Sequence, residues 1–243
     1  MNNPISGITY FLDGFRLISK PGLRRFVVIP LIINIIMFAV LFFVMRRYVN
    51  EFNYWFVNFL PAWLHWLSVI LWFLFIISFF LIFVYTFVTV TNLLCAPFNS
   101  FLAEKVELYL TGKIQEPRTL YENMKDIPRI VGRQLCILGY YLPRAFIILI
   151  LFFVPVVQGV AAIIWFIFHA WFMTMTYIDY PTDNQRVAMR DVRIWMKKKR
   201  WVSIGFGMSV LIATMIPVIN FFTIPAAVAA ATKLWLREQN QQS

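Results

Sequence analysis

The fold of this chain is decided by the stretch 19-SKPGLRRFVVIPLIINIIMFAVLFFVM-45. Its last 20 residues, Phe26–Met45, carry no formal charge. A helix rises about 1.5 Å per residue, so these residues reach about 30 Å, the thickness of the hydrocarbon core of a bilayer. The stretch therefore predicts a membrane-spanning helix over residues 26–47.

The first seven residues of the stretch place a proline, a glycine and two arginines at the start of that helix. Proline suits the first helical turn, and glycine lets a ligand approach the backbone closely. We expect the free N–H groups of Gly22, Leu23 and Arg24 to point away from the helix start. Together with the guanidinium groups of Arg24 and Arg25 they would form an oxyanion site. The alternative is that both arginines only anchor the helix at lipid headgroups, and the local sequence alone favours this anchor.

The composition of the whole chain indicates an integral membrane protein. Of its 243 residues 61% are hydrophobic and only 14% are charged, with a mean hydropathy of +0.73. Soluble domains average about 45–50% apolar and about 25% charged residues, and a soluble core cannot absorb the surplus. The net charge of +11 fits cytoplasmic loops and anionic headgroups better than nucleic acid.

The chain also carries helix patterns outside the first span. Residues 4–18 place apolar side chains on one helix face, which predicts an amphipathic helix. This helix either lies in the membrane interface or packs on the rest of the protein. A second long helix is predicted over residues 64–110, because residues 52–103 contain no formal charge. Residues 111–144 are predicted to form a polar helical segment.

Two later apolar runs, residues 145–178 and 201–232, have an unusual length. Each is too long for one span and too short for two spans with a turn, and each is broken by a proline, Pro155 or Pro217. In transporters, a pair of interrupted apolar segments indicates the position of the binding site. We therefore predict two re-entrant helical hairpins, which penetrate partway and return to the same side. Two tight hairpins that span the membrane fully are the alternative.

The remaining segments are polar, with a basic segment over residues 179–200 and a tail over residues 233–243. In this layout every Lys and Arg except Arg46 and Arg47 lies on one side of the membrane. The excess of positive charge in cytoplasmic loops then places both termini in the cytoplasm. The whole chain is thus predicted to be a single all-α membrane domain with two long spanning helices.

No catalytic, metal or cofactor site is predicted. His65 and His169 stand alone in apolar surroundings, and a metal site needs further ligands. The segment Asp179–Asn184 contains two aspartates but is predicted to be a turn with Asx capping. What remains is an excess of arginine at the predicted membrane entrances, which favours an anionic substrate. These arginines are Arg24, Arg25, Arg129, Arg133 and Arg144.

Five short motifs, in the right order along the chain, resemble the CysZ sulfate permease family of bacteria. They are Gly22-Leu23-Arg24-Arg25-Phe26, Ala96-Pro97-Phe98-Asn99, Met124-Lys125-Asp126-Ile127-Pro128-Arg129, Tyr141-Leu142-Pro143-Arg144, and Asp179-Tyr180-Pro181 with Asp183-Asn184. The resemblance implies an inner-membrane protein that admits sulfate for cysteine synthesis, with partly penetrating hairpins. It also implies that sulfate binds a Gly-Leu-Arg motif, here Gly22, Leu23 and Arg24 with Arg25 adjacent, which outweighs the anchor alternative.

The prediction is therefore sulfate uptake across the bacterial inner membrane, without ATP hydrolysis because the chain has no P-loop. The apolar runs contain no Asp, Glu, Lys or Arg, which favours passive conduction over proton coupling. The expected partners are sulfate, the lipid bilayer and further copies of the chain, since two full spans cannot enclose a polar path. Nucleic acid is not an expected partner. Two alternatives are a membrane-shaping scaffold that transports nothing and a lipid-modifying enzyme that uses His169 and Asp179.

Overall fold

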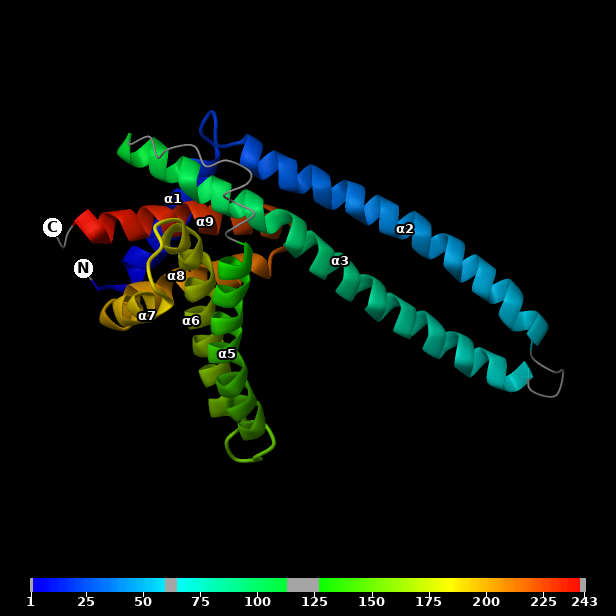
Figure 1. Ribbon diagram of the computed structural model, residues 1–243. Helices are drawn as coiled ribbons and strands as arrows, with labels where there is room; N and C mark the ends of the chain where they lie inside the picture. Colours follow the sequence, from blue (N-terminus) through cyan, green and yellow to red (C-terminus); the bar gives the residue numbers. More distant parts are fainter. Residues whose placement is uncertain (1, 60–64, 113–126, 241–243) are drawn as a thin grey trace. The chain divides into compact units, whose positions relative to one another are not determined.

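The computed structural model describes residues 2–59, 65–112 and 127–240, and every regular element in these ranges is an α-helix (Figure 1). The helices, in chain order, are α1 (Pro4–Ile18), α2 (Arg25–Phe59), α3 (His65–Thr111), α5 (Ile127–Leu151), α6 (Gln158–Asn184), α7 (Met189–Lys198), α8 (Arg200–Thr214) and α9 (Pro217–Asn240). Residues 113–126, which belong to the predicted polar segment 111–144, lie outside the described residues.

Among the residues that the structure describes, five helical stretches are long and apolar enough to cross a membrane. They are Arg25–Val49, Ile70–Phe87, Gly132–Leu151, Gln158–Asn184 and Pro217–Gln239. With helices throughout its described ranges, the chain is an all-α integral membrane protein, as the composition predicts.

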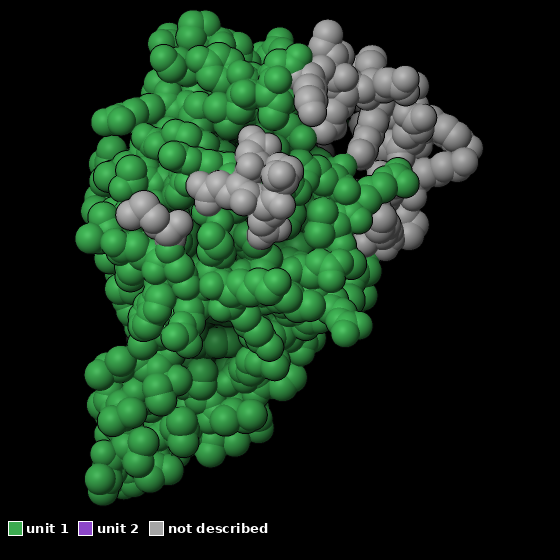
Figure 2. Space-filling view, turned by 90° about the vertical axis from the view of Figure 1, so that its left-hand side faces the viewer, with its two compact units in different colours: residues 1–27, 99–243 green, residues 28–98 purple. Residues whose placement is uncertain are grey.

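The chain divides into two compact units. Unit 1 comprises residues 1–27 and 99–243, and unit 2 comprises residues 28–98. The long helices belong to both units, because α2 begins in unit 1 and α3 ends in it. Figure 2 shows unit 1, in green, from one side.

Unit 2 consists of two long helices that pair through aromatic side chains. The ring of Phe38 on α2 lies edge-on to Phe83 and Phe87 on α3, with centroids 6.1 and 5.9 Å apart. Little of either apolar stretch is buried, so the outer faces remain available to lipid. The first helix was predicted to end at residue 47, but α2 continues to Phe59. Its charged residues extend the helix, because Arg47 Nε donates to Glu51 Oε1 at 2.9 Å, one turn further on.

The core of unit 1 forms where α1 packs between α8 and α9. Two glycines allow this close approach, since a Cβ at Gly7 would lie 2.3 Å from the Val202 carbonyl oxygen. A Cβ at Gly14 would lie 2.1 Å from the Ala226 carbonyl oxygen. One face of α1 is therefore packed on the protein. The other face offers apolar side chains to a membrane, namely Ile5, Ile8 and Leu12.

The first hairpin consists of α5 and α6, joined by residues 152–157, and it projects from the rest of unit 1 (Figures 1 and 2). The break contains Pro155, as predicted. Both arms extend beyond the predicted run 145–178, because α5 begins at Ile127 and α6 ends at Asn184.

The segment Asp179–Asn184, which was predicted to be a turn, is the last part of α6. Pro181 lies inside the helix, and the chain turns only after Asn184, where Arg186 adopts a positive φ of 57°. A proline near a helix end removes one hydrogen bond of the ladder. Here the side chains of this segment are held from another helix by Arg133, as described below. The basic residues of the predicted segment 179–200 then follow on α7.

The second hairpin consists of α8 and α9, and its break falls at Met215 and Ile216, directly before Pro217. With 15 residues, α8 reaches only about 22 Å, less than the ~30 Å of a hydrocarbon core. It is therefore too short to cross a bilayer as a straight helix, whereas α9 is long enough. The re-entrant arrangement of both hairpins stays a prediction.

Candidate functional site

A tight turn connects α1 to α2 and contains the glycine of the Gly-Leu-Arg motif. The Leu23 N–H donates to the Lys20 carbonyl oxygen at 3.2 Å, and Pro21 and Gly22 occupy the two central positions. Gly22 has a φ of +87°, as the third position of a type II turn requires. Residues with a Cβ rarely adopt this conformation, which explains the glycine at this position.

The turn leaves several backbone donors open. Within the described ranges, the N–H groups of Gly22, Arg24 and Arg25 have no acceptor, and all three residues are exposed. The N–H of Leu23 was predicted to be free, and this is wrong because the turn itself uses it. The side chain of Leu23 is 3% exposed, so this residue anchors the turn in the core of unit 1.

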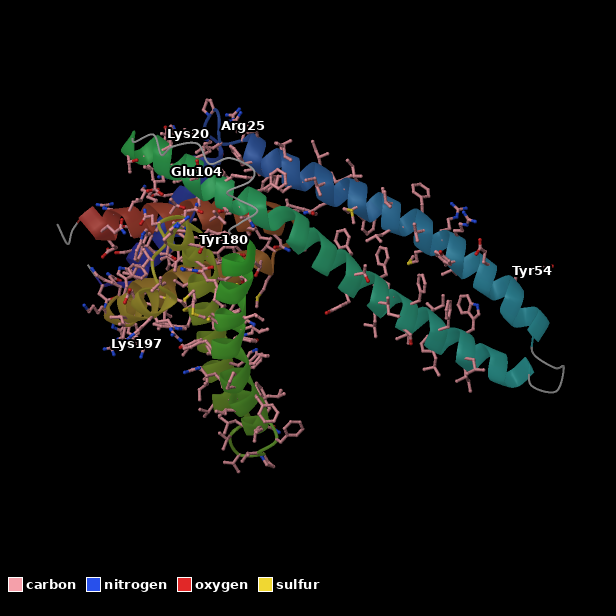
Figure 3. All side chains as sticks on the ribbon, in the orientation of Figure 1. Lys20, Arg25, Tyr54, Glu104, Tyr180 and Lys197 are labelled. Carbon is pink, nitrogen blue, oxygen red and sulfur yellow. The ribbon has the colours of Figure 1, made fainter. Side chains whose placement is uncertain are left out.

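Two arginines and one lysine belong to the same turn as these donors. Arg24 Nε donates to the Ser19 carbonyl oxygen at 2.6 Å, which holds the turn closed and leaves the Nη groups open. The Arg25 guanidinium lies 5.1 Å from the centre of the Phe26 ring. Lys20 is exposed on the same turn (Figure 3). In the part of the chain that the structure describes, no carboxylate pairs with these three cations, so the turn favours an oxyanion.

Arg133, predicted at a membrane entrance, lies instead in a buried network between α5 and α6. Its Nε contacts Asp179 Oδ1 and lies 3.6 Å from Asp183 Oδ1. Its Nη1 donates to the Val187 carbonyl oxygen at 2.5 Å, and its Nη2 donates to Thr182 Oγ1 at 2.8 Å. The arginine side chain is only 10% exposed.

This network makes Arg133 a poor anion ligand. Two carboxylates more than neutralise its charge, and four acceptor atoms surround its guanidinium. Its geometry favours a structural role, in which α5 holds the end of α6 and the start of the linker to α7. The sequence carries a signal for this, because Asp179 and Asp183 lie four positions apart and share one helix face.

Arg144 and Arg129 complete the set of predicted arginines. Arg144 is exposed, and its Nη1 donates to the Tyr140 carbonyl oxygen at 2.8 Å, while its guanidinium lies 3.8 Å from the centre of the Tyr140 ring. The side chain of Arg129 lies outside the described residues. The described contacts join neither Arg133 nor Arg144 to the turn at Gly22.

Two of the sequence motifs, the one ending at Asn99 on α3 and the one from Asp179 to Asn184 on α6, contact each other. Asn99 Nδ2 donates to the Tyr180 hydroxyl at 3.3 Å. Ser100 Oγ donates to Asn184 Oδ1 at 2.7 Å, and Asn184 Nδ2 donates back to the Ser100 carbonyl oxygen at 3.0 Å. These residues therefore position helices within unit 1.

Gln185 extends this contact, which was not predicted from the sequence. Its Nε2 donates to Glu107 Oε1 on α3 at 2.9 Å, and its Oε1 accepts the Trp235 indole N–H on α9 at 2.7 Å. A single glutamine after α6 carries no sequence signal for such a role, because its partners are 78 and 50 positions away.

The surroundings of His169 and Asp179 do not suit a shared catalytic role. His169 lies among aromatic rings, with centroids 5.0 Å from Trp165 and 5.8 Å from Tyr141. Asp179 is paired with Arg133. Among the described residues, no three His, Cys, Asp or Glu side chains are grouped so that they could hold a metal ion.

Residues 10–225 of the chain match a protein-family model described as "Sulfate transporter CysZ/Etoposide-induced protein 2.4". The match covers most of the chain and includes the turn at Gly22, both hairpin breaks and the contact of Ser100 with Asn184.

Proposed function

Because the chain belongs to the sulfate transporter CysZ/etoposide-induced protein 2.4 family, we propose that it admits sulfate across a bacterial inner membrane. The sulfate would supply sulfur for cysteine biosynthesis. The binding residues in this proposal are Gly22, Arg24 and Arg25, with Leu23 holding the turn in place.

The main support for this proposal is the structure of the turn at Gly22. Sulfate is a strongly hydrated dianion, so a binding site has to replace its water with other donors. The exposed N–H groups of Gly22, Arg24 and Arg25 and the two guanidinium groups offer such donors without a competing carboxylate. The turn also directly precedes the apolar stretch of α2, where an anion would enter the membrane region.

Passive conduction is the proposed mode of transport. No Asp, Glu, Lys or Arg occurs in residues 52–103, 145–178 or 201–232, so a buried carboxylate relay for protons has no candidate there. A proton flux that tracks sulfate flux in vesicles would instead indicate coupled transport.

Partly penetrating hairpins are a further part of the proposal. On α5 only Ala145–Leu151 separates Arg144 from the break, which is seven residues or about 10 Å of uncharged helix. On the second hairpin α8 has only 15 residues. Both lengths support hairpins that return to the cytoplasmic side, where the positive charge of the chain also places both termini. A polar path then requires several copies of the chain, so we expect a homo-oligomer.

Uptake of labelled sulfate into proteoliposomes tests the proposal. We expect uptake above the level of empty vesicles, and we expect its loss in the double variant Arg24→Ala/Arg25→Ala. Arg16→Ala is the matched control, because Arg16 is an exposed arginine on neighbouring α1 and its one ion pair within the described residues is a 3.4 Å contact with Asp13.

Two results would contradict the proposal. Uptake no higher than in empty vesicles would favour the membrane-shaping scaffold. Uptake and sulfate binding that are unchanged in the double variant would place the anion site elsewhere.

A further inference from the structure

An open groove with a volume of about 430 Å³ lies along α5 and α6, within unit 1. Most of its lining is apolar, with four isoleucines and two large aromatic side chains. These residues are Ile147, Ile148, Ile164, Ile167, Phe168 and Trp171. The volume falls within the ~300–1,000 Å³ that is typical of small-molecule sites.

One end of the groove is polar. Because α5 and α6 are joined at residues 152–157, Tyr140 and Trp171 are the lining residues farthest from that turn. The Arg144 guanidinium lies 3.8 Å from the centre of the Tyr140 ring, and the Arg193 guanidinium of α7 lies 5.6 Å from it. Within the described ranges neither arginine pairs with a carboxylate. Two positive charges thus lie close to the ring of Tyr140, which lines this end of the groove.

We propose that this groove binds one anionic glycerophospholipid. An acyl chain lies along the isoleucines, and the phosphate group contacts Arg144 and Arg193. A small inorganic anion would leave the apolar lining unused, whereas a lipid with a negative headgroup matches both parts of the groove. The site goes beyond the proposed sulfate site and shares no residue with it.

Native mass spectrometry of the purified full chain tests the headgroup contacts. We expect phosphatidylglycerol to stay bound in preference to phosphatidylcholine, and Arg144→Gln and Arg193→Gln each to weaken its binding roughly fivefold. Arg190→Gln is the matched control, since Arg190 is an exposed arginine on the same helix and, unlike Arg193, has no described contact with the Tyr140 ring. Equal binding of the two lipids, or equal effects of Arg190→Gln and Arg193→Gln, would overturn the proposal.

A second pair of variants tests the apolar lining. Ile164→Trp fills the groove and should abolish lipid binding, whereas Ile163→Trp changes a more exposed neighbour outside the lining and should not. Lipid binding that survives Ile164→Trp would overturn the proposal. Displacement of the lipid by sulfate would do so as well, because it would identify an oxyanion site. A loss of oligomer with Ile164→Trp would show that a second copy of the chain covers the groove instead.

Discussion

Arg133 of α5 and Asp179 of α6 form an ion pair in which both side chains are almost fully buried, at 10% and 7% exposed. The two residues lie 46 positions apart and join the two arms of the first hairpin. Asp183, 13% exposed, lies 3.6 Å from the same guanidinium nitrogen, so Arg133 contacts two carboxylates of α6.

The first prediction concerns this network. Arg133→Ala should lower the free energy of unfolding by about 3–5 kcal/mol, because it removes a buried cation that contacts two carboxylates. The change would appear as a lower Tm of the purified protein in detergent. Arg144→Ala removes an exposed arginine from the same helix and should change the Tm much less. Equal Tm values for the two variants would contradict a structural role of Arg133.

The second prediction concerns the conformation of Gly22. Gly22→Val requires a β-branched residue at a φ of +87° and should open the turn, with loss of sulfate binding. A Cβ at this position meets no atom within 4 Å, so the effect comes from the backbone and not from a clash. Gly22→Asn should retain more binding, because asparagine tolerates a positive φ better. Sulfate titration of the purified variants measures both, and wild-type binding by Gly22→Val would contradict the prediction.

The third prediction concerns the packing of α1. Gly14→Ala should destabilise the protein by about 1–3 kcal/mol, because the new methyl group would lie 2.1 Å from the Ala226 carbonyl oxygen. Gly139→Ala is the control, since nothing lies within 4 Å of a Cβ at that exposed helical position. Alanine should be neutral or slightly stabilising there. Thermal unfolding of the two purified variants measures the difference. If the Tm of Gly14→Ala equals or exceeds that of Gly139→Ala, α1 does not pack closely on α9 at Gly14.

The fourth prediction separates the two arginines of the motif. Arg24→Lys should impair sulfate binding more than Arg25→Lys, because lysine has no Nε–H to donate to the Ser19 carbonyl oxygen. Both variants keep the positive charge, so a purely electrostatic site would respond equally to them. Calorimetric titration with sulfate provides the comparison.

The fifth prediction concerns the depth of the first hairpin. In a chain with Cys95 and Cys136 replaced by serine, Val156→Cys should resist a membrane-impermeant thiol reagent from both sides. Val156 is 93% exposed in the hairpin break, so only lipid would protect it. Tyr54→Cys should react from one side of the membrane and Lys197→Cys from the other. Reaction of Val156→Cys from the same side as Tyr54→Cys would indicate a fully spanning hairpin.

The helices of this protein could be predicted because their signals are local. Long uncharged runs predict α2 and α3, and the proline breaks at Pro155 and Pro217 mark both hairpin tips. The end of α2 was placed too early, because the charged residues after residue 45 were interpreted as the end of the helix. Arg47 and Glu51 instead stabilise it by an i,i+4 pair.

The site was predictable in its residue types and less so in its geometry. The Gly-Leu-Arg motif predicted free donors at the start of the spanning helix, but Pro21 and Gly22 form a turn before α2 begins at Arg25, and this turn uses the Leu23 N–H. The motif does not specify this backbone geometry. The helical state of Asp179–Asn184 was missed for a different reason. It depends on contacts with Arg133 and Ser100, which are distant in the chain.

The hydrogen bond from Arg24 to Ser19 has a consequence for how an ion would be held. A guanidinium can present two parallel N–H groups along the edge that contains Nε or along the edge formed by its two Nη groups. The first edge of Arg24 is already occupied, so an ion at this turn meets the Nη edge. We therefore expect the ion to bind end-on to this arginine, in an orientation that the contact with Ser19 fixes.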